Sequence, residues 1–154
     1  MTDPPTGKQI VGGKWVFNVK GDTNNPTYKA RYVAKGFSQI EGVDYTETFS
    51  PIARMETVRT LMQIAADENL ILHQMDVKSA YLHVPIDEDV YVTQPSGYTV
   101  EGKVWKLNKS LYGLKQSGRN WHTMLHEYLL ELNFNPSSAD ACLYIKRDLS
   151  LIHI

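Results

Sequence analysis

The sequence predicts an α+β domain in which helices lie on one face of an antiparallel sheet. Near the N-terminus, two runs rich in β-forming residues flank a segment dense in turn residues. Two later segments repeat apolar residues at helical spacing, and short apolar runs between them predict further strands. With 154 residues, of which 42% are hydrophobic, the chain is long enough to bury a core of its own.

The first predicted element is a β-hairpin formed by residues 14–20 and 28–35. The segment between these runs contains Gly-Asp-Thr-Asn-Asn-Pro at residues 21–26, which favour a turn. By the two-residue period of a strand, Lys29, Arg31 and Lys35 share one face of the second strand. Such a row of cations suits phosphate binding, and it equally suits an edge strand that uses charge to prevent aggregation. The residues alone leave both interpretations open.

Helices and short strands are expected to follow the hairpin. Apolar residues at helical spacing over residues 54–68 predict an amphipathic helix. The apolar run 70–75 has the length of a partly buried strand and carries Asp76 at its C-terminal end. The remaining elements are expected in this order: strands at 90–93 and 104–107, a second long helix at 117–133, and a strand at 141–146.

Composition excludes several classes of protein. Cys142 is the only cysteine, which rules out an internal disulfide and a cysteine-rich zinc site and fits a reducing compartment. No apolar run approaches the roughly 18 residues that cross a bilayer, and the polar first residues are not a secretory signal. We therefore expect an intracellular protein without a membrane partner, in either the cytoplasm or the nucleus.

Charge is distributed unevenly along the chain, although the net charge is only −1. Residues 1–40 carry a net +4, residues 41–100 a net −7 and residues 101–154 a net +2. A protein that grips phosphates at two edges of a carboxylate-bearing site has this kind of distribution. Scattered surface charge produces it as well.

Asp76 is the first candidate for chemistry. A carboxylate at the end of a strand can hold Mg²⁺, because that ion takes hard oxygen ligands and keeps water and substrate phosphates in its shell. A single carboxylate is not a metal site, since two-metal phosphoryl transfer needs at least a second one. Asp76 also suits a helix cap or turn, because residues 78–82 can begin a short helix.

Five blocks of sequence narrow these alternatives. They are KWVF at 14–17, YKARYVAKGF at 28–37, DYTETFSP at 44–51, HQMDVKSAYL at 73–82 and LYGLKQS at 111–117. In this order they resemble the reverse transcriptase domain of copia-type LTR retrotransposon Pol polyproteins. The resemblance covers about residues 10–146.

The resemblance implies a partial right-hand polymerase fold. In this interpretation residues 1–154 form a single partial domain, with a fingers hairpin, an incomplete antiparallel palm sheet and two long helices. The thumb and RNase H regions are expected to be absent. The implied partners are an RNA or DNA template-primer and deoxynucleoside triphosphates, and the implied cofactor is Mg²⁺. The sequence does not determine the oligomeric state.

The resemblance also implies roles for particular residues. Asp76 matches the first catalytic aspartate, a ligand of Mg²⁺, and the backbone carbonyl of Val77 matches a further ligand. Tyr81 matches the aromatic residue whose ring collides with a ribose 2′-OH. The expected nucleotide-binding residues are Lys20, Lys29 and Arg31 in the fingers hairpin, Val77 and Tyr81 beside the aspartate, and Gly113, Lys115 and Gln116 in the loop that frames the pocket.

Two departures from the family pattern are visible. Gly118 stands where the family generally has proline. The paired aspartates of the Tyr-Val-Asp-Asp motif are missing, and neither Asp140 nor Asp148 matches them in spacing or surroundings. We therefore expect a truncated polymerase fragment that is inactive alone. A non-enzymatic nucleic-acid-binding module and a relic without function remain alternatives.

Two histidines have a simpler interpretation than metal binding. His122 and His126 lie four residues apart on the second predicted helix, but no Glu stands between them as in the HExxH zinc motif. We expect both side chains to be exposed to solvent.

Overall fold

The computed structural model describes residues 1–148 and 151–153, with side chains as far as Lys146. The chain folds into two compact units. The first contains Met1–Thr48 and Ser79–Asn120, and the second contains Phe49–Lys78 and Trp121–Ile154.

A small three-stranded sheet forms the centre of the first unit. Strand β1 (Ile10–Val11) pairs in parallel with β4 (Tyr91–Val92), and β4 pairs antiparallel with β5 (Trp105–Lys106). The core around this sheet consists of Val11, Ala34, Ile86, Val90, Val92 and Leu114, with Tyr32, Leu107 and Leu111 packed against it. The two central valines, Val11 and Val92, are fully buried, which fixes the pairing of β1 with β4.

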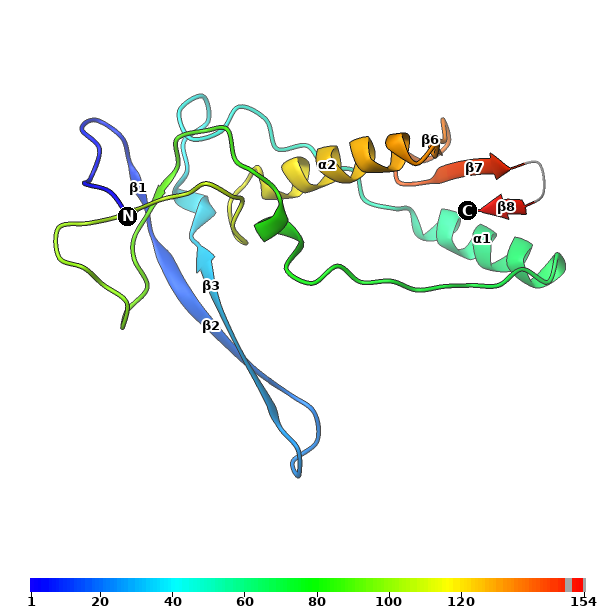
Figure 1. Ribbon diagram of the computed structural model, residues 1–154, viewed down its shortest axis with the longest axis horizontal. Helices are drawn as coiled ribbons and strands as arrows, with labels where there is room; N and C mark the ends of the chain where they lie inside the picture. Colours follow the sequence, from blue (N-terminus) through cyan, green and yellow to red (C-terminus); the bar gives the residue numbers. More distant parts are fainter. Residues whose placement is uncertain (149–150, 154) are drawn as a thin grey trace. The chain divides into compact units, whose positions relative to one another are not determined.

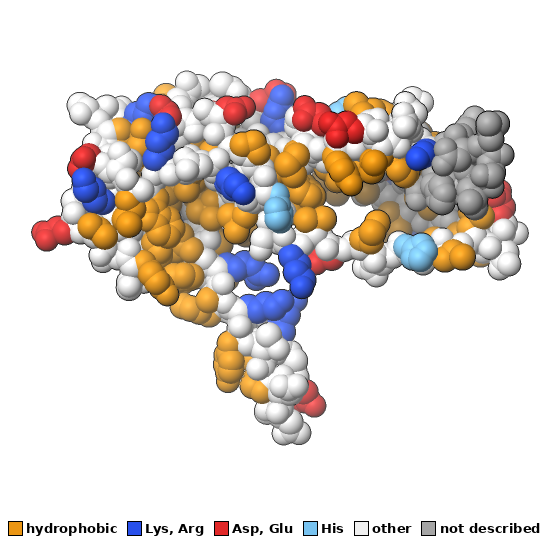
Figure 2. All heavy atoms as spheres, in the orientation of Figure 1, with side chains coloured by type: hydrophobic (Ala, Val, Ile, Leu, Met, Phe, Trp, Pro, Cys, Tyr) orange, Lys and Arg blue, Asp and Glu red, His pale blue; other side chains and the backbone are white. Residues whose placement is uncertain are grey.

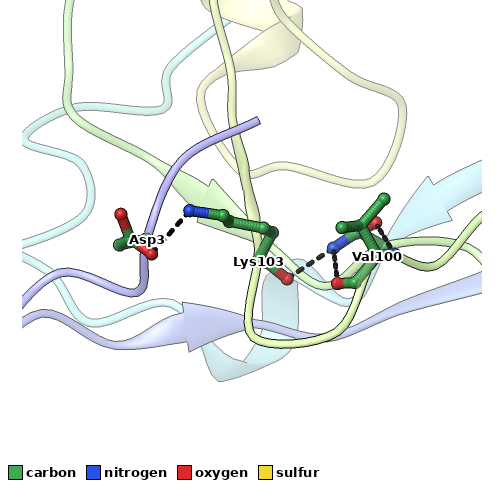
Figure 3. A network of polar contacts seen from close by, with 4 residues as sticks. Asp3, Val100 and Lys103 are labelled. Atoms are coloured by element: carbon green, nitrogen blue, oxygen red, sulfur yellow. Dashed lines mark hydrogen bonds and ion pairs between the residues drawn. The ribbon is translucent and has the colours of Figure 1, made fainter.

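Polar contacts hold the edges of this sheet. The Asp89 carboxylate lies 2.6 Å from the Lys106 ammonium and 3.1 Å from that of Lys8. The hydrogen bond and charge of Lys106, followed by those of Lys8, lower the pKa of Asp89. The N-terminal segment is attached in the same way, because Lys103 pairs with Asp3 at 2.8 Å and lies beside Val100 (Figure 3).

A long β-hairpin extends away from this sheet (Figure 1). Strands β2 (Gly13–Lys20) and β3 (Thr27–Ala34) pair antiparallel along their whole length, from Gly13 opposite Ala34 to Lys20 opposite Thr27. The Asn25 N–H donates to the Asp22 carbonyl at 2.9 Å and closes the turn. The half of the hairpin near the turn is exposed on both faces, so cross-strand pairs alone stabilise it there.

The two faces of the hairpin differ in chemistry. Residues opposite one another in the ladder share a face. One face therefore carries Lys14, Val16, Asn18 and Lys20 from β2 with Thr27, Lys29, Arg31 and Val33 from β3. The other face is aromatic, with Trp15 5.5 Å from Tyr32 and 6.1 Å from Phe17 between ring centroids. Figure 2 shows Lys and Arg side chains on one side of the hairpin and hydrophobic side chains on the other.

The second unit contains the helix α1 (Met55–Asp67) and a three-stranded antiparallel sheet. The strands are β6 (Asn135–Pro136), β7 (Tyr144–Asp148) and β8 (Leu151–His153), in the order β6-β7-β8. The helix α2 (Ser117–Glu131) begins in the first unit and continues into the second. Leu61, Ile64, Leu143 and Ile145 line a cavity of about 510 Å³ within the second unit.

The mixed α+β class, the hairpin and both long helices are confirmed, with helix ends within two residues of the predicted ones. The short strands predicted at 90–93, 104–107 and 141–146 are also present, with shifted ends. The predicted antiparallel pairing is present in small antiparallel sheets, and in one sheet β1 also pairs in parallel with β4. No helix of the described residues is long and apolar enough to cross a membrane.

The strand predicted at 70–75 is absent. Residues 70–77 form no regular secondary structure and have no partner strand, and Ile71, Leu72, Met75 and Val77 are exposed, Met75 by 92%. Residues 70–75, of which four are apolar, have the composition of a partly buried strand, but a strand also needs a neighbour that completes its hydrogen bonds. Among the described residues none pairs with this segment. Asp76 therefore lies on an exposed connecting segment rather than at a strand end.

Candidate functional site

An open cavity of about 820 Å³ lies in the first unit. Three segments line it: the middle of the hairpin, the short 3-10 helix η2 (Ala80–His83) with the preceding Ser79, and the start of the loop 111–117. The lining residues are Trp15, Val16, Ala30, Arg31, Tyr32, Val33, Ser79, Ala80, Tyr81, Leu82, Leu111 and Tyr112. The cavity thus brings together Arg31 and Tyr81, two of the residues predicted to bind a nucleotide.

Tyr81 reaches the cavity because of an unusual backbone conformation. Ser79 is left-handed, with φ 55° and ψ 42°, and the Leu82 N–H donates to the Ser79 carbonyl at 2.9 Å. This conformation turns the chain from the extended segment into η2, where Tyr81 is half-buried. The Tyr81 ring lies 5.8 Å from the ring of Tyr112, between centroids, at an interplanar angle of 30°.

The loop 111–117 is joined to the base of the hairpin by backbone hydrogen bonds. The Ala34 N–H donates to the Tyr112 carbonyl at 2.8 Å, and the Gly36 N–H donates to the Gly113 carbonyl at 3.1 Å. Gly113 has φ +96°, and a Cβ atom there would lie 2.1 Å from the Ala34 carbonyl oxygen. Only glycine permits this close approach. The close neighbour of the Gly113 backbone is therefore the hairpin.

Gln116 is buried inside the first unit, with 1% of its surface exposed. Its amide donates to the Asp44 carbonyl at 2.9 Å and accepts from the Gln39 amide at 3.0 Å. The Gln39 oxygen accepts from the Lys115 N–H at 2.8 Å. Gln116 thus joins the loop 111–117 to the segment 39–44 through buried hydrogen bonds. The Lys115 side chain is exposed, with its ammonium 5.6 Å from the centre of the Tyr45 ring.

The predicted hairpin cations occupy one face. Lys20, Lys29 and Arg31 share it with Lys14, and all four side chains are exposed. Of these cations, Arg31 is the one that lines the cavity, while Lys20 lies at the end of β2 next to the turn. Neither strand of the hairpin contains Asp or Glu, so the two strands supply no carboxylate that could neutralise the cationic face.

Asp76 and Val77 belong to the second unit, and both are exposed. Asp76 does not cap η2, because the residue at the helix start is Ser79 and no side chain caps it. Among the described residues, no group of three or more His, Cys, Asp or Glu side chains is placed to hold a metal ion. The Asp148 side chain lies outside the described residues.

Asp140 has a structural environment that the sequence did not reveal. It is buried, and one carboxylate oxygen accepts from the Thr57 hydroxyl at 2.7 Å and from the Arg54 N–H at 3.0 Å. The other oxygen accepts from the Cys142 N–H at 2.8 Å. The hydrogen bond from Thr57, followed by those from the two N–H groups, lowers the pKa of Asp140 to about 2. Asp140 therefore caps the start of α1 from a distant part of the sequence.

The two histidines of α2 are half-buried, so the prediction that they are exposed is wrong. The His126 Nδ1 atom lies 2.9 Å from the Tyr144 hydroxyl, and the His122 and His126 rings stack with centroids 6.2 Å apart. His126 thus packs against Tyr144 of β7, and His122 packs against His126.

Sequence comparison identifies the class of protein to which this chain belongs. Residues 1–152 match the family described as reverse transcriptase (RNA-dependent DNA polymerase). The chain belongs to this family. The prediction from the five sequence blocks is confirmed.

Its curated relatives are Pol polyproteins of copia-type transposons. The chain is 43% identical over 152 residues to the Retrovirus-related Pol polyprotein from transposon TNT 1-94 of Nicotiana tabacum, covering 96% of this chain and 11% of the relative. It is 40% identical over 157 residues to that from transposon RE1 of Arabidopsis thaliana, covering 98% and 11%. With the Transposon Ty1-ER2 Gag-Pol polyprotein of Saccharomyces cerevisiae it shares 36% over 129 residues, covering 80% and 7%.

The chain thus spans about a tenth of the length of these relatives. No solved structure matches it.

Proposed function

We propose that this chain is the fingers and part of the palm of a copia-type RNA-directed DNA polymerase, forming one partial polymerase domain. The observation that carries the proposal is the cavity that Arg31, Tyr81 and Tyr112 line together. In this proposal the hairpin is the fingers and the cavity receives the sugar and phosphates of an incoming deoxynucleotide.

The chemistry of the cavity supports this proposal. Its volume of about 820 Å³ is in the range of small-ligand sites. The Arg31 guanidinium supplies a fixed positive charge with paired donors for phosphate oxygens, and Lys29 and Lys20 continue the cationic face along the hairpin. Tyr81 supplies a rigid ring that forms a wall of the cavity. A 2′-OH on a bound ribonucleotide would meet this ring, which favours the deoxy form.

A divalent metal is implied for the family, and the described residues do not make a complete site for it. Asp76 offers one carboxylate, and the Val77 carbonyl offers one more oxygen. Phosphoryl transfer with two metal ions needs further carboxylates, and no cluster among the described residues supplies them. The proposal therefore assigns nucleotide and template binding to this chain and predicts no polymerisation by the chain alone.

Primer extension tests the assignment. The purified 154-residue chain, given a primed RNA template, Mg²⁺ and deoxynucleotides, is expected to extend no primer above the background set by Asp76→Asn. The same preparations should bind the primed template equally well, because Asp76 is exposed and its replacement leaves the fold intact. Extension that depends on Asp76 would contradict the predicted inactivity.

Electrostatic binding of nucleic acid by the hairpin alone is the second candidate function, and the cationic face of β2 and β3 favours it. Lys29→Ala and Arg31→Ala are each expected to weaken binding of a single-stranded oligonucleotide. Each should also reduce the slope of log K against log salt by about 0.7 per lost phosphate contact, measured by fluorescence anisotropy.

Lys109→Ala is the matched control, since this exposed lysine lies in the same unit but outside the hairpin and the cavity lining. It should leave the slope unchanged. An equal loss at Lys109, or no binding by the unmodified chain at low salt, would exclude the hairpin as a nucleic-acid site.

A further inference from the structure

We infer that Tyr112 is a positioning residue for Tyr81: its ring holds the Tyr81 ring against the cavity and thereby determines how strongly the site discriminates between deoxyribose and ribose. The inference rests on the proposed nucleotide-binding function. It concerns a residue of the loop 111–117 that lines the cavity beside Tyr81.

Tyr112 is fixed to the fold through its backbone. Its carbonyl accepts from the Ala34 N–H. The next residue, Gly113, has no side chain and so packs directly against the hairpin backbone, and Leu114 is buried in the core. The Tyr112 side chain nevertheless remains 60% exposed. A large aromatic ring on a rigid backbone and at the rim of a cavity is placed to support a neighbour.

Tyr81 has fewer restraints of its own. It lies on a single turn of 3-10 helix that follows the left-handed Ser79. Among the residues that the structure describes, no hydrogen bond from a partner holds the Tyr81 hydroxyl. The ring contact with Tyr112, with centroids 5.8 Å apart, therefore opposes rotation of the Tyr81 ring.

The contact matters because steric discrimination depends on where the ring stands. A ring that rotates away from the cavity leaves room for a 2′-OH, whereas a ring held in place excludes it. Loss of Tyr112 should therefore change the ratio of ribonucleotide to deoxynucleotide affinity. A general loosening of the unit would weaken both affinities together.

The first measurement follows the Tyr81 ring directly, by ¹⁹F NMR of the full chain with fluorotyrosine at position 81. Tyr112→Leu should shift and broaden the signal, and Tyr112→Phe should preserve it because it keeps the ring. Tyr98→Leu is the control, since Tyr98 is an exposed tyrosine of the same unit that contacts Trp15 and does not line the cavity. A signal unchanged in Tyr112→Leu overturns the inference.

The second measurement compares affinities for dATP and ATP in the presence of Mg²⁺ and a primed template with thymine at the next position. The unmodified chain should bind ATP about tenfold more weakly than dATP. Tyr112→Leu should bring the ratio close to one, and Tyr112→Phe should retain it. Binding of neither nucleotide by the unmodified chain would refute the proposed function, and with it the sugar-discriminating role. A ratio retained in Tyr112→Leu would refute the inference alone.

Discussion

Replacement of Gly113 by alanine is expected to destabilise the first unit by more than about 4 kcal/mol, which is exceptional for a single substitution. The new Cβ atom would lie 2.1 Å from the Ala34 carbonyl oxygen, a backbone atom that cannot rotate away. The new alanine would also have to keep φ +96°, a backbone angle that residues other than glycine rarely adopt. Separation of the loop from the hairpin would then break the hydrogen bonds of Ala34 and Gly36.

Gly97→Ala separates steric overlap from backbone strain. Gly97 has φ +89° in the same unit, but nothing lies within 4 Å of a Cβ built there. Its replacement should cost only about 1–2 kcal/mol, the penalty of a left-handed conformation. Denaturant unfolding of the two variants measures the difference. Similar losses in both would show that the loop yields at Gly113 and does not depend on this close approach.

Removal of the Asp140 carboxylate should produce the largest loss in the second unit. In Asp140→Ala, the Thr57 hydroxyl and the N–H groups of Arg54 and Cys142 lose their acceptor in a partly buried place. The start of α1 also loses a negative charge that favours the positive end of the helix dipole. We expect a lower Tm and faster amide exchange over the first turn of α1.

Asp67→Ala is the control, since this carboxylate is exposed at the other end of α1 and bonds only the Gln63 side chain among the described residues. It should leave Tm nearly unchanged. Protection of the first turn of α1 that survives in Asp140→Ala would argue against the capping role.

The same carboxylate predicts a pH dependence. The folded pKa of about 2 lies below the ordinary value of 3.8, so the ionised form is stabilised by folding. The contribution is fully present above about pH 4 and is lost as the pH falls toward 2. Asp140→Asn, which lacks the ionisable group, should show a smaller loss of stability over this range.

Local patterns in the sequence were sufficient for the helices and the hairpin. Apolar spacing marks α1 and α2 within the chain itself, and a dense turn segment between two β-rich runs marks β2 and β3. These elements satisfy most of their hydrogen bonds locally, so local residue choices specify them. Family resemblance added Tyr81 and Arg31, which the structure brings to one cavity.

Features that depend on distant partners could not be predicted. The run 70–75 has the composition of a strand but lacks a described partner, and β1 has only two residues and pairs with β4 far along the chain. Gln116 was expected to bind the nucleotide because of its place in the loop 111–117, and Asp140 was given no role, whereas the structure buries them beside Gln39 and Thr57. The one local sign of the burial of Asp140 was its position between small and apolar residues.

The discontinuous sequence of the first unit has a kinetic consequence. The hairpin is local and can form as soon as residue 34 is available, but β1 gains its parallel partner only when Tyr91 and Val92 have joined the chain. Closing so long a loop slows folding more than it affects final stability. During that interval the aromatic face of the hairpin lacks its contacts with Tyr98 and Trp105, which come later in the chain. Cations on the opposite face then limit edge-to-edge association of nascent chains, so the face that we propose for binding also protects the hairpin during assembly.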